Sequence, residues 1–392
     1  MSSQALAVQF CERCLMPDTR PRIVFTDGVC NACLWAEEKK TIDWDARADE
    51  FRVLAGRGFA YGSHRPPPKA GAYHCIVPFS GGKDSAMIAW RLKFEHGLNP
   101  LLVTYGQLLW TDVGRRNLDR VCNAGFDILY WRVNQNVSRK LARRFMVERG
   151  HPKQHYDAGV NTVPLIAAVR FNIPLVFYAE HGETEYGGLV LDEESRRTRN
   201  LEEVLEHQVG DDPRNWATDG ISEADLAPYL YPSAVEIERV GVKAFYFSYF
   251  FPWDIYENAQ QAYDKLGFDQ AWNLIPSLSH TPNSLWWGKS DGSFEGFDSI
   301  DDKIDDLDYY MMHIKFGFGR ATRMASRMIQ NGHLTREQGL ELVRRYDGEY
   351  PESYLPDVLE YLQMTREELD NVVDLHRNPE LWDGRTLRFP PS

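Results

Sequence analysis

Short apolar runs alternate with amphipathic stretches through the middle of the chain. Apolar runs of strand length, bounded by turn-forming or polar residues, occupy 75–79, 100–105, 127–133 and 173–180. Patterns with helical periodicity follow them at 86–92, 114–124, 138–149 and 163–171. Because such alternation favours right-handed βαβ units, it predicts an α/β fold on a parallel sheet. An aromatic run at 245–254 predicts a further strand, and 255–266 predicts the helix after it.

The same pattern divides the chain into three regions. The central region, 72–290, carries the alternating elements and includes a charged insertion at about 192–242. It is preceded by residues 1–55 and followed by a mostly helical region at 291–392. Glycine and proline are frequent at 56–71, which predicts a linker between the first two regions.

One turn in the central region has the composition of a phosphate site. Between the first strand and its helix the chain reads Ser80, Gly81, Gly82, Lys83, Asp84 and Ser85. Glycines let the backbone approach an anion closely, and the free N–H groups of a helix start favour a phosphate. The hydroxyls and the lysine add donors and positive charge. The spacing is not that of the Walker A motif. The alternative is a glycine-rich turn without a ligand.

Two other strand ends carry polar residues that a parallel sheet would bring to the same edge. Asp112 lies in a cluster at 111–117, which reads either as part of a ligand site or as a helix cap. Glu180 and Glu185 lie in a second cluster that holds three carboxylates within six residues. Crowded carboxylates need a compensating cation, and Mg²⁺ on a triphosphate would supply one. The alternative is an acidic surface loop.

The segment 315–320 interrupts the helical pattern of the C-terminal region with Gly317 and Gly319. Glycine inside a helix lowers stability, so a close backbone approach to a ligand would explain both positions. Lys315 and Arg320 flank them and could neutralise a leaving pyrophosphate. The alternative is two basic residues beside a helix kink.

The N-terminal region contains two CxxC pairs. Cys11 and Cys14 precede Cys30 and Cys33 by a spacing typical of tetrahedral zinc sites. Four thiolates leave no open coordination position, so the predicted zinc is structural. A redox dithiol and a [4Fe–4S] cluster are the alternatives. A charged helical run at 34–54 follows the last cysteine.

Charge and hydropathy indicate which classes of partner, nucleic acid or membrane, the chain is suited to bind. The chain has 44 lysine and arginine residues against 57 aspartate and glutamate residues, and its net charge is −13. Such a balance argues against nucleic-acid binding, since that binding draws on clustered positive charge. No apolar stretch has the length of a membrane span, and the N-terminus does not read as a signal peptide. We therefore expect a cytoplasmic protein.

Taken in order, these motifs resemble one family. The turn at 80–85 resembles the PP-loop of the ATP pyrophosphatases, whose adenine nucleotide alpha hydrolase-like fold is Rossmann-like. The whole ordered set of motifs resembles the N-acetyl sugar amidotransferases of surface-polysaccharide and lipopolysaccharide O-antigen biosynthesis. This set consists of the turn, the two CxxC pairs and the segments 111–114, 180–188 and 315–320. Position 181 is histidine where asparagine is more frequent in that family.

The resemblance implies a reaction and a set of cofactors. The acetamido group of a nucleotide-linked sugar would become an acetamidino group by adenylation of its oxygen and attack of ammonia. ATP, Mg²⁺ and structural zinc are the implied cofactors. The residues implied to bind the nucleotide and its metal are Ser80, Gly81, Gly82, Lys83, Asp84, Ser85, Asp112, Glu180 and Glu185. The implied catalytic residues are Lys83, Asp84, Lys315 and Arg320.

The source of ammonia is predicted to lie on another chain. Neither Cys75 nor Cys122 stands in the sequence context of a glutaminase nucleophile. We therefore expect a separate glutaminase subunit, together with a cyclase-like protein that channels ammonia.

Two other functions fit parts of the sequence. A PP-loop tRNA thiolation enzyme would combine the nucleotide turn with structural zinc, but it would need a catalytic cysteine and a polyanion partner. A catalytically inactive scaffold would keep the zinc and nucleotide modules without the reaction. The intact turn at 80–85 argues against the scaffold.

Overall fold

A computed structural model describes residues 8–57, 72–190, 192–200, 204–218, 220–268 and 290–391. Most of the predicted linker, 58–71, lies outside these residues. The central feature is a five-stranded sheet in the order β5-β4-β3-β6-β7, with every neighbouring pair parallel. Its strands are β3 (Cys75–Pro78), β4 (Pro100–Tyr105), β5 (Ile128–Trp131), β6 (Leu175–Tyr178) and β7 (Lys243–Tyr246). The α/β fold predicted from the alternating pattern is thereby confirmed.

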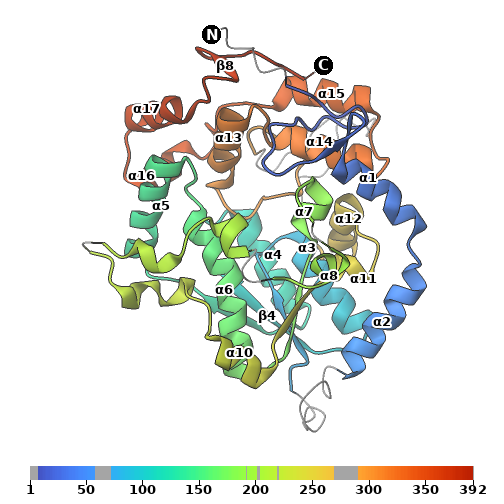
Figure 1. Ribbon diagram of the computed structural model, residues 1–392. Coiled ribbons are helices and arrows are strands. Elements are labelled where there is room, and N and C mark those ends of the chain that lie inside the picture. Colours follow the sequence, from blue (N-terminus) through green and yellow to red (C-terminus); the bar gives the residue numbers. More distant parts are fainter. Residues whose placement is uncertain are drawn as a thin grey trace.

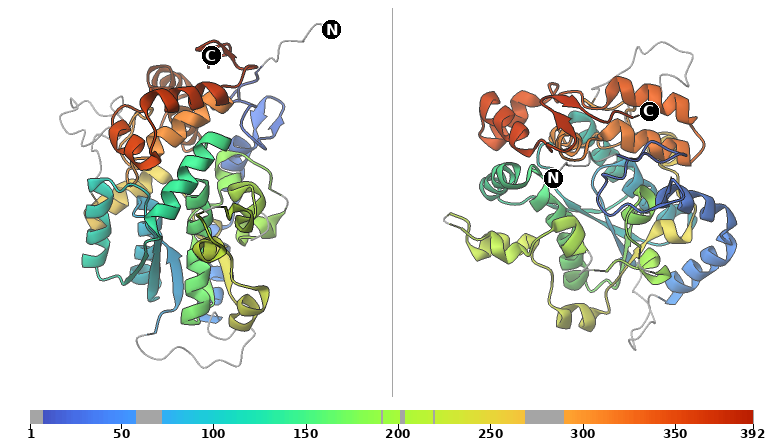
Figure 2. Two further views of the ribbon diagram at one scale, coloured as in Figure 1. Left: turned by 90° about the vertical axis from the view of Figure 1, so that its left-hand side faces the viewer. Right: turned by 45° about the horizontal axis from the view of Figure 1, so that its top comes forward.

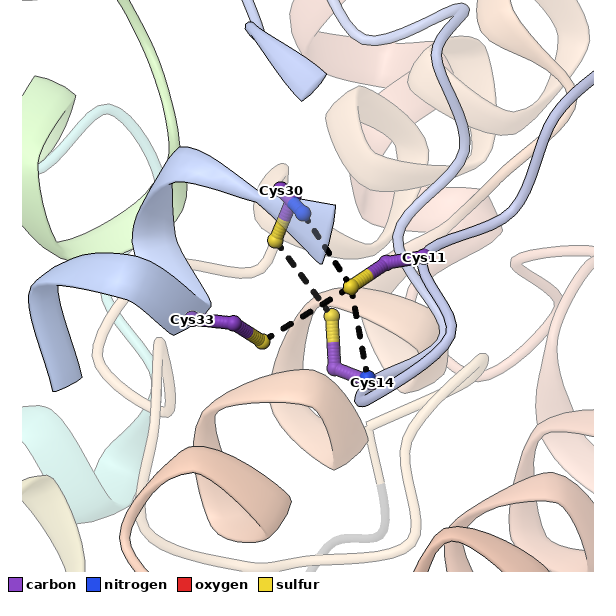
Figure 3. Close-up of side chains that lie close together, drawn as sticks. All are labelled: Cys11, Cys14, Cys30 and Cys33. Atoms are coloured by element: carbon purple, nitrogen blue, oxygen red, sulfur yellow. Dashed lines mark hydrogen bonds between the residues drawn. The ribbon is translucent and has the colours of Figure 1, made fainter. Parts of the chain in front are cut away.

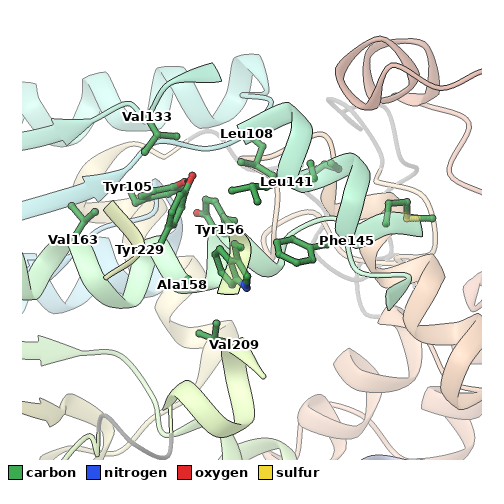
Figure 4. Packing of buried hydrophobic residues seen from close by; sticks show 14 of the residues in the cluster. Tyr105, Leu108, Val133, Leu141, Phe145, Tyr156, Ala158, Val163, Val209 and Tyr229 are labelled. Carbon is green, nitrogen blue, oxygen red and sulfur yellow. The ribbon is translucent and has the colours of Figure 1, made fainter. Parts of the chain in front are cut away.

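Alternate strand residues enter two different cores, one on each face of the sheet. Ile76, Val103 and Val176 belong to the first hydrophobic cluster, together with residues of α5 and α6. Val77 and Phe177 belong to the second, together with residues of α3 and α12. Figure 4 shows part of the first core, where Tyr105, Tyr156 and Tyr229 lie near Leu141 and Phe145. Both faces are buried, as expected for continuous apolar strands.

Helices cover both faces of the sheet (Figures 1 and 2). Those that follow the first strands are α3 (Lys83–Trp90), η2 (Arg91–Glu95), α4 (Asp112–Asn123), α5 (Gln135–Arg149) and α6 (Gln154–Phe171). The segment 182–240 holds α7 (Gly182–Tyr186), α8 (Glu193–Arg197), η3 (Leu205–Val209), η4 (Pro213–Trp216), η5 (Glu223–Tyr229) and α10 (Ala234–Val240). After β7 come α11 (Phe247–Phe250) and α12 (Ile255–Leu266).

The C-terminal region is helical and rests on the carboxyl edge of the sheet. It consists of α13 (Asp305–Phe316), α14 (Arg320–Gln330), α15 (Arg336–Tyr346), α16 (Leu355–Leu362), α17 (Arg366–His376) and the hairpin β8 (Trp382–Asp383) with β9 (Thr386–Leu387). Leu307 lies in the first core and Met324 in the second, so this region closes both. The loop after β4 holds it through a bridge between Trp110 and Asp302.

The N-terminal segment lies beside the C-terminal helices, as Figure 1 shows in blue and orange. It contains the hairpin of β1 (Phe25–Thr26) and β2 (Val29–Cys30), then α1 (Asn31–Glu38), η1 (Lys39–Thr41) and α2 (Trp44–Arg57). The predicted helical run at 34–54 is therefore broken. Asp43 explains the break, because its carboxylate accepts the backbone N–H of Ala46 at 3.0 Å and begins a new helix.

The helix predicted at 163–171 is longer in the structure, because α6 begins at Gln154. The aromatic run at 245–254 also differs from its prediction. The strand β7 begins earlier and ends at Tyr246, and Phe247–Phe250 form the short helix α11. Because the run is apolar at nearly every position, its periodicity does not distinguish a strand from a buried helix.

Candidate nucleotide site and four-cysteine cluster

A cavity of about 370 Å³ opens at the carboxyl ends of β3 and β6. The chain leaves β3 toward β4 on one side and passes from β6 to β7 on the other, so this is the topological switch point of the sheet. Doubly wound sheets bind ligands at this point. The predicted turn contributes Ser80, Gly82, Lys83, Asp84 and Ser85 to the lining of the cavity.

The turn has the geometry expected of an anion cradle. Gly81 has φ of +101°, a backbone conformation that strains any residue with a side chain, and a Cβ there would lie in tight contact, 3.1 Å from the ring of Trp110. Gly82 is the N-cap of α3, and no side chain caps its N–H groups. The start of this helix therefore points free donors at the cavity.

Lys83 is held by carboxylates from two regions of the chain. Its Nζ lies 2.8 Å from Asp84 Oδ2 and 2.9 Å from Asp298 Oδ1, and its side chain is 4% exposed. Burial alone would lower the pKa of Lys83, but the two carboxylates hold it well above its usual value. Lys83 is thus a cation held in a fixed position at the start of α3, in the lining of the cavity.

Asp298 links this lysine to the C-terminal helices. Its second oxygen, Oδ2, lies 3.0 Å from Arg323 Nη1, and Arg323 also donates to the hydroxyl of Tyr309 at 2.7 Å. Arg323 lies one helical turn beyond Arg320 on α14. Sequence reasoning missed both Asp298 and Arg323, because neither belongs to a recognisable motif.

Glu180 is the acidic residue of the second polar cluster that lines the cavity. It accepts a hydrogen bond of 2.9 Å from the Tyr186 hydroxyl. Burial and the nearby carboxylate of Asp84 raise the pKa of Glu180. Two half-buried carboxylates that repel each other fit a site for a divalent cation shared with phosphate oxygens, because Mg²⁺ takes one or two protein carboxylates in such sites.

Glu185 does not line the cavity. Its carboxylate accepts from Trp35 Nε1 at 2.8 Å and pairs with Lys39 and Arg327. Burial acts to raise the pKa of Glu185, but these two cations lower it to about 2. The residue joins α7 to the N-terminal segment and to α14.

Asp112 is exposed in the first turn of α4, outside the cavity. The cap in this cluster is Thr111, whose hydroxyl accepts from the Gly114 N–H at 3.0 Å. The helix-cap interpretation therefore describes this cluster.

Lys315 and Arg320 also lie outside the cavity lining. The amine of Lys315 donates to the carbonyl of Arg149 at 3.2 Å. Arg320 is 1% exposed, and its guanidinium is bound by Asp306 at 3.2 Å and by the carbonyl of Asp298. Arg320 thus acts on the cavity through the loop that carries Asp298.

The two glycines beside them have structural explanations. Gly317 ends α13 with φ of +75°. At Gly319 a Cβ would lie 2.6 Å from Asp347 Oδ1, and the Gly319 N–H donates to that carboxylate at 2.8 Å. A close approach by Asp347, rather than by a ligand, accounts for this position.

Other charged and polar side chains of the cavity come from segments far apart in sequence. Lys153 pairs with Asp305, and its Nζ lies 3.8 Å from Asp302. Arg199 stacks 4.1 Å over the ring of Tyr178. Gln107 donates to the Ser80 carbonyl at 2.8 Å. Sequence reasoning missed Lys153, Arg199 and Gln107, because only the fold brings them together.

Next to the cavity, one histidine is held between two carboxylates. His151 contacts Asp308 through Nδ1 at 2.7 Å and Asp157 through Nε2 at 2.9 Å, and Asp157 lines the cavity. Burial acts to lower the pKa of His151, but Asp308 and Asp157 raise it to about 10. The imidazolium fixes the orientation of Asp157.

His181 has a structural role. It is the N-cap of α7, and its Nδ1 accepts the backbone N–H of Thr184 at 3.1 Å. Burial, with Arg199 nearby, lowers the pKa of His181 to about 4, so the ring is neutral and able to accept. An asparagine would cap this helix in the same way.

The four predicted zinc ligands form one buried cluster (Figure 3). Their sulfur atoms all lie within 4.8 Å of one another, with Cys11 and Cys33 at 3.8 Å and Cys14 and Cys30 at 3.7 Å. A tetrahedron with Zn–S bonds of about 2.3 Å has edges of about 3.8 Å. The cysteines are not disulfide-bonded. The cluster is consistent with structural zinc. A [4Fe–4S] cluster would place each thiolate on a separate iron, so the four sulfur atoms would lie farther apart than they do here.

The cysteine cluster packs against the C-terminal region rather than standing alone. Phe318 is part of its apolar surroundings, Leu15 N–H donates to Ser326 Oγ at 3.3 Å, and Arg336 donates to the Cys14 carbonyl at 3.2 Å. On the other side, Arg20 donates to the carbonyl of Gly187 at 2.6 Å. The segment therefore connects α14 to the loop after α7.

The fold and the cavity define a doubly wound α/β protein with a cavity at its switch point and a four-cysteine cluster. Residues 291–389 match the family described as LPS biosynthesis protein WbpG-like, C-terminal domain. The C-terminal region of the chain is therefore similar to the C-terminal domain of WbpG-like lipopolysaccharide biosynthesis proteins. No curated protein matches the chain. Among the described residues, no helix is both long and apolar enough to cross a membrane.

Proposed function

We propose that the chain is the synthetase subunit of an ATP-dependent N-acetyl sugar amidotransferase in O-antigen biosynthesis. It would convert the acetamido group of a nucleotide-linked sugar into an acetamidino group. The observation that carries the proposal is the cradle of Ser80–Ser85 at the switch point, facing Glu180 and closed by Asp298 of the WbpG-like region. ATP would bind in this cavity, with its phosphates at the start of α3.

The reaction has two balanced steps. The amide oxygen attacks the α-phosphorus of ATP. The bond between that phosphorus and the oxygen that bridges it to the β-phosphorus breaks, and pyrophosphate leaves. Ammonia then attacks the imidate carbon, the C–O bond breaks, AMP leaves with the electron pair, and a proton is lost from nitrogen. The amide carbon is a poor electrophile, and the first step gives it a good leaving group, AMP. The cavity must then keep water from the intermediate.

The residues of the cavity have distinct roles in this proposal. The backbone N–H groups in the first turn of α3 would present donors to phosphate, whereas the Gly82 N–H and the Ser85 hydroxyl form hydrogen bonds within the turn itself. Lys83 would place a cation beside the leaving pyrophosphate. Asp84 and Glu180 are the residues that would hold Mg²⁺, whose charge offsets the triphosphate and their own mutual repulsion. Arg323 and Arg320 fix Asp298, which in turn positions Lys83.

Zinc in the cysteine cluster would stabilise the fold without entering the reaction. The four sulfur atoms are buried and leave no open coordination position. Binding of the ion would add folding free energy to a segment that has a small core of its own.

Ammonia would come from a separate glutaminase subunit, with a cyclase-like channelling partner. Four of the six cysteines belong to the cluster, Cys75 is buried in β3, and Cys122 is exposed on α4. Neither Cys75 nor Cys122 lines the cavity. The same placement disfavours the tRNA thiolation alternative, which needs a cysteine near the nucleotide. The cytoplasmic location stays a prediction.

Mass spectrometry tests the reaction directly. Candidate nucleotide sugars incubated with ATP, Mg²⁺ and ammonium should lose about one mass unit, as O is replaced by NH, and AMP should appear. Lys83→Gln should lower AMP formation by at least a hundredfold, since a charge-stabilising group of the transition state is removed. Lys40→Ala, a change at an exposed lysine bound to Glu37, is the matched control. Wild-type turnover in Lys83→Gln would refute the assignment.

A further inference from the structure

A second pocket, of about 240 Å³, lies on the β5 side of the nucleotide cavity. We call it the arginine pocket, because Arg115, Arg132, Arg139 and Lys303 converge on it. Only Asp357 and Glu360 contribute opposite charge to its lining, and Lys303 already pairs with Asp357 at 2.6 Å. The pocket is therefore cationic on a chain whose net charge is −13.

The three arginines have no carboxylate partner among the residues that the structure describes. Arg115 and Arg132 are exposed, and Arg139 is half-buried with its guanidinium 5.6 Å from the Tyr361 ring centroid. The Nε of Arg139 is buried without a hydrogen-bond acceptor in the described structure. Guanidinium groups with free donors bind phosphate oxygens in a bidentate fashion. A phosphate ligand would supply the missing acceptor.

The charge of the arginine pocket is opposite to that of the nucleotide cavity. The cavity lining holds six acidic side chains, among them Asp84 and Glu180, against three basic ones. Phosphates entering the cavity therefore need a metal, whereas the arginine pocket accepts them without one. Two phosphate-bearing ligands with different requirements can be held side by side in this arrangement.

The two spaces share Gln107. Its Nε2 donates to the Ser80 carbonyl and to Asp301 on the cavity side, while its Oε1 is buried without a donor. The Leu108 and Leu109 N–H groups each donate to Asp302 at 3.0 Å, so the wall between the two spaces is fixed. A ligand anchored in the arginine pocket would extend past Gln107 into the nucleotide cavity.

We infer that the arginine pocket binds the diphosphate of the acceptor, the nucleotide-linked sugar, and so directs its sugar toward bound ATP. The inference rests on the proposed function and adds the place where the acceptor is held. The pocket is smaller than the roughly 300–1,000 Å³ of complete ligand sites, so it holds part of the acceptor. The sugar of such an acceptor is joined directly to the β-phosphate, so a diphosphate held in the arginine pocket would leave the sugar next to Gln107, which lines both spaces.

Calorimetric titration with a panel of nucleoside diphosphates tests the inference on the full chain saturated with a nonhydrolysable ATP analogue. Wild type should bind at least one member of the panel. The double variant Arg115→Gln/Arg139→Gln should bind it at least tenfold more weakly, because two charge-assisted hydrogen-bond donors are lost. ATP-analogue affinity should stay within twofold. Arg344→Gln, at an exposed arginine on α15, is the matched control.

Several outcomes would overturn the inference. These are wild-type affinity in the double variant, an equal loss of ATP-analogue binding, and exclusion of the diphosphates by the analogue. Tighter wild-type binding of inorganic pyrophosphate than of every nucleoside diphosphate would assign the pocket to the ATP product instead. If the double variant misfolds, the single variants Arg115→Gln and Arg132→Gln give the same test at exposed positions. None of these titrations needs turnover, so they remain decisive if no amidino sugar forms.

Discussion

At the scale of single residues, His151 gives the structure a defined pH dependence. Asp308 and Asp157 raise its pKa to about 10, whereas an unfolded histidine has a pKa of about 6.5. Since the folded pKa is the higher one, the stabilisation is complete below about pH 6.5 and is lost as the pH rises through 10. The charged groups that contact the ring are Asp157 and, on α13, Asp308, and Lys153 and Lys315 act on Asp308 in turn.

We predict that His151→Gln lowers the free energy of unfolding by roughly 3 kcal/mol at pH 6 and by much less at pH 10. Urea unfolding at the two pH values measures the difference. In an Asp308→Asn background the same substitution should cost less at pH 6, because the two residues are coupled. A cost that is equal at both pH values would show that the ring acts through packing alone.

At the scale of elements, α7 is fixed by polar contacts to three other elements. Glu185 contacts Trp35 of α1, Lys39 of η1 and Arg327 of α14, and both Glu185 and Arg327 are 2% exposed. The same short helix follows Glu180, so its position sets where that carboxylate enters the cavity. Sequence reasoning assigned Glu185 to a ligand because charge crowding was visible and its distant cationic partners were not.

We predict that Arg327→Gln destabilises the fold by about 3 kcal/mol, because it leaves Glu185 buried with only Lys39 as a cation. Arg344→Gln, on exposed surface, should stay within about 0.5 kcal/mol of wild type. Urea unfolding at neutral pH checks both values. If both variants unfold at the same urea concentration as wild type, the buried pair does not hold α7.

How far the sequence predicted the elements depended on whether their periodicity was distinct. The continuous apolar run of β4 and the pattern of α12 were placed with the bounds that the structure has. The run at 245–254 failed because aromatics at nearly every position fit either periodicity. The break before α2 depended on one capping residue, Asp43, which composition alone does not single out.

In the candidate site, residues that are contiguous in sequence could be predicted, and residues brought together only by the fold could not. Residues 80–85 are contiguous, so their composition and the strand and helix around them were enough to predict a phosphate cradle. Asp298 and Lys153 line the same cavity from distant parts of the sequence, and Arg323 acts through Asp298, so no spacing in the sequence relates these residues to the turn. The placement of Lys315 away from the cavity likewise depended on the direction in which α13 ends.

At the scale of the whole molecule, the cysteine cluster lies where the three regions meet. The N-terminal segment binds Ser326 and Arg336 of the C-terminal region, and Arg20 binds Gly187 of the central region. The same C-terminal helix, α14, carries Arg323, which holds Asp298 against Lys83. A metal in the cluster would therefore stabilise more than its own segment.

We predict that the purified chain contains about one zinc per molecule by elemental analysis, and that Cys14→Ser and Cys33→Ser each lose it. Because the cluster supports α14, metal loss should lower the melting temperature by several degrees and weaken ATP binding severalfold. Cys122→Ser, which changes an exposed cysteine on α4, should keep the metal, the melting temperature and the affinity. If the metal-free protein keeps both its melting temperature and its affinity for ATP, the cluster does not couple the three regions. A fall in melting temperature without a change in affinity would confine its effect to the N-terminal segment, since the contact between Arg323 and Asp298 would then hold without it.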